Sequence, residues 1–345
     1  MIKNYFVWDL GATKCSAGIV EHNVKTNELY CKKKCSIKLA NTSSLEDLIH
    51  QLEQQLDFFM TQADAICIGA AGHYDGESLL LEGVYPYPMP FASIAKLQKW
   101  PCYTVIHDYA PIVCATFTDY MDNANNVFRL NTCPINHAGR RVAFGLGTGL
   151  GGKDGVLFPD GNFWLGQNEM GHIGITHPPA SEVFYSNRHS ELIRFLQNTQ
   201  DHQAITFEKV LSGPGLARLF QFFYPSQGIL TPEEVGYKIQ QGQAPEILDT
   251  VAWYLGLFVG TLQLMFMPEG GIWITGGVAL NHLNVFNHPD FFVGIKTSPA
   301  YLLQRQEFPL GVLCNLEHAL IGSAYYASKK LIHTYSDLTV PGLSC

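Results

Sequence analysis

The sequence lacks paired cysteines and has no excess of positive charge. Its nine cysteines are scattered over 345 residues, and none forms a Cys-x-x-Cys pair. Cys31-Lys-Lys-Lys-Cys35 has neither a second pair nor zinc-site spacing nearby. An odd cysteine count, with Met1 to Trp8 too short for a secretory signal, predicts reduced thiols and a cytoplasmic location. A net charge of -8 argues against nucleic acid or an acidic membrane as the main partner.

Uninterrupted apolar runs are also scarce. The longest, Val251 to Met267, contains Thr261 and Gln263. We interpret it as a helix buried inside a large domain, and a membrane span is the alternative. With 345 residues, 47% hydrophobic and 15% charged, the chain is long enough for two soluble domains with separate cores.

Glycine, in contrast, is concentrated in one central stretch. The segment from Ala143 to Gly152 has glycine at the alternate positions 145, 147, 149 and 151. Glycine permits backbone angles that a Cβ forbids, and it lets main-chain N–H groups approach an anion. The stretch therefore suits a phosphate cradle between two strands, and an ordinary hairpin turn is the alternative.

A related turn lies at the N-terminus. The strand Tyr5 to Trp8 ends in Asp9-Leu-Gly11-Ala-Thr13-Lys14, and Cys15 to Val20 reads as a second strand. The turn therefore joins a hairpin, unlike a P-loop, whose glycines lead into a helix. Asp9 would hold a cation or its water, and Thr13 and Lys14 would meet phosphate oxygens. A plain hairpin capped by Asp is the other interpretation.

The segments after the first turn alternate between helix and strand. We expect helices at 44–62, 91–100 and 109–121, and strands at 65–72 and 102–107. Asp108 follows the last of these strands. Ligands of open α/β sheets gather beyond the carboxyl ends of the strands, so Asp108 stands where a reacting carboxylate is expected. It also suits the N-cap of the following helix, and the two roles are compatible.

Two polar motifs follow the central turn. Glu169-Met-Gly-His172 could bind a metal, could pair within the core, or could hydrogen-bond a polyol. Glu208-Lys-Val-Leu-Ser-Gly-Pro-Gly215 ends in a sharp turn before a short helix. Helices are expected at 182–197, 232–242, 245–267 and 317–331, and strands at 271–275 and 310–315. The pair Gly276-Gly277 would let a flat ring lie against the backbone.

In this order, the motifs resemble the sugar-kinase, hexokinase and actin-like ATPase superfamily, and more narrowly the bacterial glucokinase family. The resemblance covers nearly all of residues 1–330. It implies an α/β protein with two ribonuclease-H-like domains of the actin-like ATPase (sugar kinase) fold and a cleft between them. We expect a smaller α/β domain at 1–110, with a C-terminal helix at about 317–335 packing back on it, and a larger α/β domain at 111–316.

The resemblance also implies the activity: transfer of a phosphoryl group from ATP, with Mg²⁺, to the 6-hydroxyl of a hexose such as glucose. Asp108 would be the catalytic base, and Asp9 would act on Mg²⁺ indirectly. The implied sugar residues are His107, Glu169, His172 and Glu208. The implied nucleotide residues are Asp9, Leu10, Gly11, Ala12, Thr13, Lys14, Gly147, Thr148, Gly149, Gly276 and Gly277. Hexose and MgATP are the expected partners, and a homodimer is left open.

Three departures from the family pattern concern the sugar. His107 replaces the usual Asn before the catalytic Asp, Tyr85 to Pro90 replaces an Asn-containing segment, and Met170 replaces a glycine. A kinase for another hexose, or a catalytically weak sugar-binding regulatory protein, are therefore the alternatives to glucokinase activity.

Overall fold

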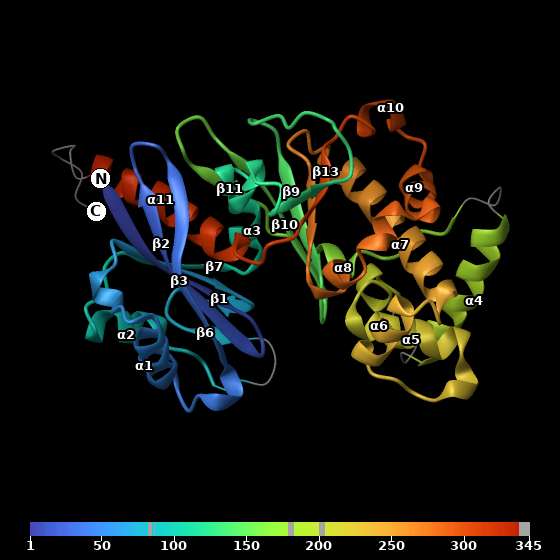
Figure 1. The fold of residues 1–345 in the computed structure, drawn as a ribbon, viewed down its shortest axis with the longest axis horizontal. Coiled ribbons are helices and arrows are strands. Elements are labelled where there is room, and N and C mark those ends of the chain that lie inside the picture. Colours follow the sequence, from blue (N-terminus) through green and yellow to red (C-terminus); the bar gives the residue numbers. More distant parts are fainter. Residues whose placement is uncertain (82–84, 86, 179–182, 200–203, 338–345) are drawn as a thin grey trace. The chain divides into compact units, whose positions relative to one another are not determined.

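The computed structural model describes residues 1–81, 85, 87–178, 183–199 and 204–337. By internal contacts these residues form two compact units. The first comprises the described parts of Met1–Val127, Gly155–Leu165 and Asn315–Cys345, and the second those of Phe128–Asp154 and Gly166–Cys314. Each is an α/β unit with its own sheet and core (Figure 1).

The first unit is built on a five-stranded sheet in the order β3-β2-β1-β4-β7. The strands are β1 (Ile2–Leu10), β2 (Lys14–Asn23), β3 (Glu28–Lys38), β4 (Ala65–Ala70) and β7 (Tyr103–His107). Strand β1 runs antiparallel to β2 and parallel to β4, which is parallel to β7. In this register Leu10 is level with Ala70, and Ala70 with His107, so three carboxyl ends lie at one edge.

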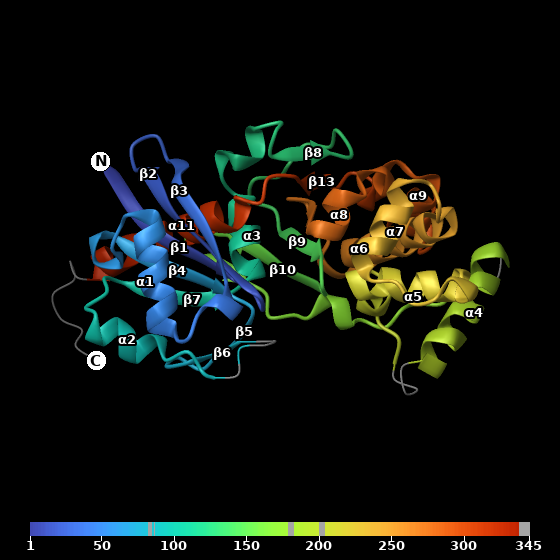
Figure 2. The same cartoon turned by 60° about the horizontal axis from the view of Figure 1, so that its bottom comes forward.

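Helices cover this sheet because alternate side chains of its strands are apolar on each face. Phe6, Trp8 and Leu10 of β1 pack with apolar side chains of α1 (Leu45–Leu56) and α2 (Phe91–Leu97). Helix α11 (His318–Asp337) packs against β1, β4 and α3 (Tyr109–Ala115) (Figure 2). A small hairpin, β5 (Gly72–Tyr74) and β6 (Leu79–Leu81), follows β4.

The second sheet has the order β11-β10-β9-β12-β13-β8. Its strands are β8 (Val127–Arg129), β9 (Arg141–Leu146), β10 (Leu150–Leu157), β11 (Phe163–Leu165), β12 (Ile272–Thr275) and β13 (Leu310–Leu313). Strand β12 is parallel to both β9 and β13. Strand β11 pairs with the last residues of β10, from Gly155 onward, all of which belong to the first unit.

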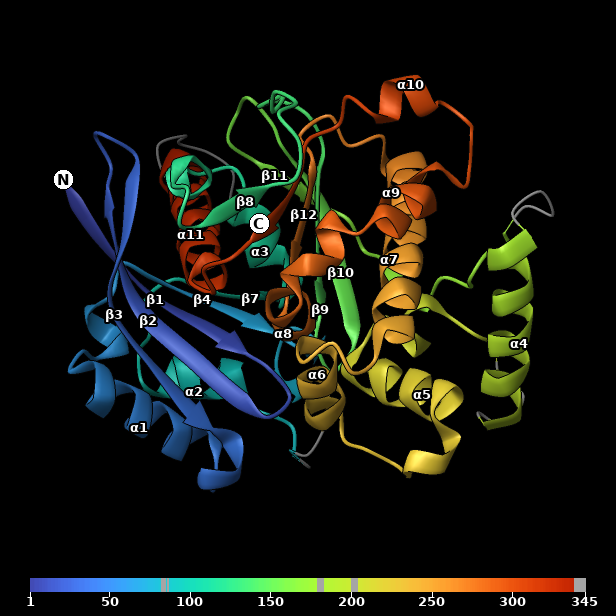
Figure 3. The same ribbon diagram turned by 45° about the vertical axis from the view of Figure 1, so that its right-hand side comes forward.

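Helices supply most of the second unit's core. They are α4 (Val183–Thr199), α5 (Gly213–Phe223), α6 (Pro232–Gln240), α7 (Pro245–Phe266), α8 (Gly277–Asn281), α9 (Pro289–Lys296) and α10 (Leu302–Arg305). Helix α7 packs along α9 (Figure 3) and is largely buried. It is long and apolar enough to cross a membrane, but 78% of its most apolar window is buried within the protein, as expected for a core helix.

Most expected elements are confirmed, and the differences have local causes. Helix α1 ends at Leu56, not near Gln62, because Asp57 adopts a left-handed conformation (φ 46°). Helix α3 ends at Ala115, where the Thr116 hydroxyl donates to the carbonyl of Val113. Strand β3 was not expected. It is a half-exposed strand at the edge of the sheet, and its lysine-rich sequence is not typical of a buried strand. Of the segment from Tyr85 to Pro90, Pro86 lies outside the described residues.

The units also differ from the expected domain boundaries. Residues 111–127 and 155–165 belong to the first unit by contact, because they pack on α11 and its neighbours. Phe163, for example, contacts the rings of Tyr325 and Tyr326 at 5.7 and 6.0 Å between centroids. The domain boundaries 1–110 and 111–316 remain a prediction.

Close packing of α11 on α3 gives a first test. A Cβ added at Gly322 would clash with the backbone carbonyl of Pro111, so Gly322→Ala should lower the free energy of unfolding by about 1–3 kcal/mol. Lys330→Ala, on the exposed side of the same helix, should change it by less than about 0.5 kcal/mol. Chemical denaturation measures both, and equal stabilities would contradict this packing.

Candidate active site

In the first unit, the β1–β2 turn presents a short run of polar residues. Asp9 and Leu10 end β1, and Lys14 begins β2. The Gly11 N–H donates to the Lys14 carbonyl (3.0 Å), which closes the turn. Thr13 and Lys14 are exposed. The Leu10 side chain is fully buried in the core, so only its backbone is available to a ligand.

Asp108 lies at the same sheet edge as Asp9. Its N–H donates to the carbonyl of Ala70 (3.1 Å), and the N–H of Ala71 donates to the carbonyl of Leu10 (2.9 Å). These bonds continue the parallel register of β1, β4 and β7 beyond the last paired residues. The carboxyl ends of these three strands are thereby held together. The carboxylates of Asp9 and Asp108 are close enough to interact electrostatically.

The side chain of Asp108 does not cap α3. Its backbone is helical (φ -57°, ψ -31°), and its carboxylate accepts no hydrogen bond from the first turn of the helix. One carboxylate oxygen, Oδ1, is buried and accepts no hydrogen bond, and His107 Nδ1 lies 2.8 Å from it, forming an ion pair only when the histidine is protonated. The N-cap interpretation is therefore wrong for the side chain. A polar oxygen kept buried in this way needs another explanation.

Asp9 is the titratable group that this arrangement perturbs most clearly. Burial, and then the neighbouring negative charge of Asp108, raise the pKa of Asp9 to about 6, against a smaller opposing effect of Lys14. The protein thus holds a carboxylate at a position where its negative charge is disfavoured. A bound cation would reverse that balance.

In the second unit, the glycine-rich turn connects β9 to β10. Within it, the Gly147 N–H donates to the Gly149 carbonyl (2.9 Å), and the Gly147 carbonyl accepts from the Gly213 N–H (2.7 Å). Leu150 N–H donates to Glu208 Oε2 (2.9 Å). A Cβ at Gly149 would lie 2.7 Å from the same oxygen. A larger residue at position 149 would therefore displace the Glu208 carboxylate.

Glu169, His172 and Glu208 come from two neighbouring 3₁₀ turns, η4 (Met170–His172) and η5 (Phe207–Lys209). The Phe207 N–H donates to the Ile173 carbonyl (3.0 Å), which ties the segments together. Glu169 and His172 have exposed side chains, and Glu208 is half-buried. This part of the sequence pattern is therefore brought together within one unit.

Met170 is one of the departures, and its position is informative. Its side chain is 1% exposed and belongs to the core cluster of the second unit. The sulfur lies near Gly152, where an added Cβ would be 3.0 Å away. The extra bulk at this position therefore fills the core and does not cover Glu169 or His172.

Among the residues that the structure describes, no group of three or more His, Cys, Asp or Glu side chains could hold a metal.

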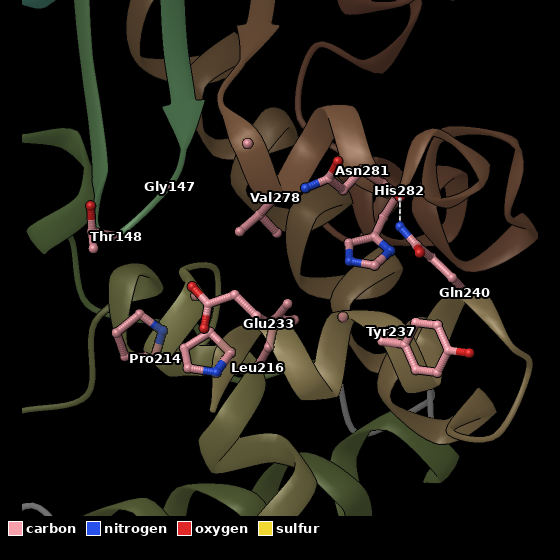
Figure 4. A pocket seen from close by; sticks show the side chains of 14 residues that line it. Gly147, Thr148, Pro214, Leu216, Glu233, Tyr237, Gln240, Val278, Asn281 and His282 are labelled. Atoms are coloured by element: carbon pink, nitrogen blue, oxygen red, sulfur yellow. Dashed lines mark hydrogen bonds between the residues drawn. The ribbon is translucent and has the colours of Figure 1, made fainter. Parts of the chain in front are cut away.

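A pocket of about 540 Å³ opens beside the glycine-rich turn (Figure 4). Three expected nucleotide residues, Gly147, Thr148 and Gly277, line it. Gly276 supports the wall behind them, with φ 96° and a Cβ position that would clash with the Leu146 carbonyl. The other lining residues are Gly213, Pro214, Leu216, Pro232, Glu233, Gly236, Tyr237, Gln240, Val278, Asn281 and His282.

Sequence analysis missed most of this lining. The Ser212-Gly-Pro-Gly turn was visible, but its use here was not: Ser212 caps α5 by accepting from the Gly215 N–H (3.1 Å), and Gly213 and Pro214 face the pocket. Helix α6, which supplies the opposite wall, carries no motif that sets it apart. His282 is buried and lies at the far side of the pocket. Burial lowers the pKa of this histidine, which keeps the ring neutral at neutral pH.

Comparison with known proteins gives a consistent result. A family model described as Glucokinase matches residues 6–330. A glucokinase of Agrobacterium fabrum is 26% identical over 299 residues, which cover 85% of this chain and 83% of the relative. The crystal structure of a glucokinase from an Antarctic psychrotroph superposes with a TM-score of 0.78 at 19% identity, covering 94% of this chain and 98% of the other.

A third protein was crystallised with ligands. It is a ROK family glucokinase from Streptomyces griseus in complex with glucose and AMPPNP, with a TM-score of 0.55 at 16% identity. The match covers 94% of this chain and 97% of the other. The two solved structures establish the fold: the two-domain actin-like ATPase fold of sugar kinases.

The perturbed carboxylate predicts an unusual pH dependence. A carboxyl with a higher pKa in the folded than in the unfolded protein binds more protons when folded, so stability falls as the pH rises from about 4 to about 6. Asp9→Asn should therefore raise the melting temperature at about pH 7.5 and have a much smaller effect near pH 4.

Asp64→Asn is the matched control for this test. Asp64 accepts from Lys3 Nζ (2.6 Å) and from the Asn4 N–H (2.8 Å), so the same change of charge should lower the melting temperature at neutral pH. A lower neutral-pH melting temperature for Asp9→Asn as well would contradict the destabilised carboxylate.

Proposed function

Because the chain belongs to the glucokinase family, its reaction is hexose phosphorylation, and we propose that Asp108 is the base of that reaction. The observation that carries the proposal is the position of Asp108 at the carboxyl end of β7, where one of its carboxylate oxygens is buried and accepts no hydrogen bond. A carboxylate is an acceptor, and the 6-hydroxyl of a hexose is the donor that it lacks. Accepting this proton while the hydroxyl oxygen attacks phosphorus is general base catalysis.

We assign the remaining hydroxyls of the sugar to Glu169, His172 and Glu208. These side chains lie on adjoining 3₁₀ turns, and they supply both acceptors and a donor for a polyol. Glu208 also accepts from Leu150 N–H through Oε2, which leaves Oε1 for the ligand. A site built this way rejects sugars that lack a matching hydroxyl, because its polar groups would stay unpaired once the bound sugar excludes water. Glucose is the hexose that we propose.

The phosphoryl donor in this proposal is ATP, bound in the pocket beside the glycine-rich turn. Its lining combines Gly147 and Thr148 with the N-terminus of α5. The positive end of the α5 dipole favours a phosphate there. AMPPNP in the Streptomyces griseus structure supports a nucleoside triphosphate as the donor.

Mg²⁺ is the cation that fits Asp9. Magnesium is usually held by one or two carboxylates together with waters and substrate phosphates. Asp9, with its pKa raised to about 6 by burial and Asp108, is a carboxylate that such an ion would stabilise. Bound there with ATP, the ion would neutralise charge on the phosphate oxygens. Lys14 and the β1–β2 turn are the groups of the first unit that we propose for phosphate binding.

We also propose a cellular setting for the reaction. We place it in the cytoplasm, where ATP is available and thiols stay reduced. The eight cysteines that the structure describes are all free thiols. A homodimer remains a prediction, which measurement of the mass in solution would test.

Replacing the base separates catalysis from folding. Asp108→Asn should lower kcat by about two to four powers of ten, with hexose and ATP still bound. Its stability should equal or exceed that of the wild type, because the side chain does not cap α3 and its loss of charge relieves Asp9. The control is Asp122→Asn, an exposed acid of the same unit. Near-normal kcat in Asp108→Asn, measured by coupled ADP release, would remove Asp108 from the chemistry.

Glu208 tests the sugar assignment. Glu208→Gln keeps an oxygen for Leu150 N–H but loses the charge, so the KM for hexose should rise about ten- to a hundredfold. The KM for ATP should change by less than about twofold. Glu208→Ala also removes the bond to the turn, and should weaken both substrates. If Glu208→Gln weakened ATP alone, Glu208 would belong to the nucleotide site.

A further inference from the structure

We infer that Glu233, in the first turn of α6, accepts hydrogen bonds from the ribose hydroxyls of the bound nucleotide. The inference rests on the proposed function, which places ATP in the 540 Å³ pocket. In the proposed function, the glycine-rich turn and the helix termini recognise the phosphates of the nucleotide. Glu233 would add recognition of its ribose.

Glu233 lies midway along the pocket. Figure 4 shows Thr148 and Gly147 toward one end, His282 and Gln240 toward the other, and the Glu233 carboxylate between them. A nucleotide with its phosphates at the glycine-rich turn must extend away from it, ribose first and base beyond. The carboxylate therefore lies where the ribose passes.

The two adjacent glutamates of α6 differ in their contacts. Glu234 belongs to a capping box: its Oε2 accepts from the Thr231 N–H (2.8 Å), and its own N–H donates to Thr231 Oγ1 (3.3 Å). For Glu233, no hydrogen bond or ion pair forms with any part of the chain that the structure describes. The helix is thus capped without Glu233, whose carboxylate faces the pocket.

The negative charge of Glu233 also needs a partner in the ligand. Glu233 carries the only formal charge among the fourteen residues that line the pocket, because burial lowers the pKa of His282. An anion placed near a triphosphate repels it unless it receives hydrogen bonds from the ligand. The vicinal 2′- and 3′-hydroxyls of a ribose are two donors at the right spacing for one carboxylate, which has only acceptors.

The far end of the pocket suits an uncharged base. The Gln240 Nε2 donates to the Asn281 carbonyl (3.2 Å), which ties α6 to the end of α8. Gly236 keeps the helix close to His282, since a Cβ there would lie 3.3 Å from its Nε2. A carboxylate also pairs well with guanine, whose N1–H and N2–H are donors. Glu233 lies between the glycine-rich turn and this end of the pocket, so the ribose is a better partner for it than the base.

Nucleotide binding without turnover tests the inference. Calorimetric titration with ADP, 2′-deoxy-ADP, 3′-deoxy-ADP and GDP should show the wild type binding at least one deoxynucleotide about tenfold more weakly than ADP. Glu233→Ala should bind ADP about tenfold more weakly, and should no longer discriminate against the deoxynucleotides. Glu233→Gln, which keeps one acceptor, should fall between the two.

Glu234→Gln is the matched control, because it removes the same charge one residue away and keeps a capping-box side chain. It should bind all four nucleotides as the wild type does, and melting curves verify that each variant is folded. Wild-type discrimination retained in Glu233→Ala would overturn the inference. So would a preference for GDP that disappears in Glu233→Ala, which would assign the carboxylate to guanine. Hexose-dependent ADP release, measured separately, tests the proposed function whatever the titrations show.

Discussion

The parallel register of β1, β4 and β7 is the constraint on which the chemistry of the first unit depends. Hydrogen bonds from Asp108 N–H to Ala70 and from Ala71 N–H to Leu10 carry that register past the strand ends. Two carboxylates are thereby held at one sheet edge, and the pKa of Asp9 rises to about 6 through burial and the charge of Asp108. This is unfavourable for folding. It is the kind of local cost that functional sites retain.

In the second unit, our proposal gives one side chain, Glu208, two roles. Glu208 accepts from Leu150 N–H next to the glycine-rich turn, and in our proposal it also meets the sugar. A change in the sugar site can therefore reach the phosphate turn through a single carboxylate. A side chain at position 149 would displace the Glu208 carboxylate from this contact.

Much of the fold could be predicted from the sequence, because its hydrophobic periodicity is strong. The glycine turns, the strand before Asp108 and the long apolar helix α7 all match the structure. Residue patterns singled out Asp108 and the two glycine turns, and the resemblance implied their roles, which the structure does not test. Strand β3 escaped notice because it is a polar edge strand, and α1 proved shorter because Asp57 adopts a left-handed conformation.

The pocket lining shows where such prediction ends. Glu233 and Glu234 are identical in type and adjacent in sequence, yet one caps a helix and the other faces the pocket. Only the direction of each side chain distinguishes them. The same is true of Met170, which the sequence pattern associated with the sugar site and whose side chain is part of the core.

The central claim is that this chain phosphorylates a hexose at its 6-hydroxyl. The most direct measurement is ADP release from ATP with a panel of hexoses, followed by phosphorus NMR of the sugar product. The account predicts release that depends on sugar, is fastest with glucose, and yields glucose 6-phosphate. Release that is independent of sugar, or a phosphate on any other hydroxyl, would contradict it.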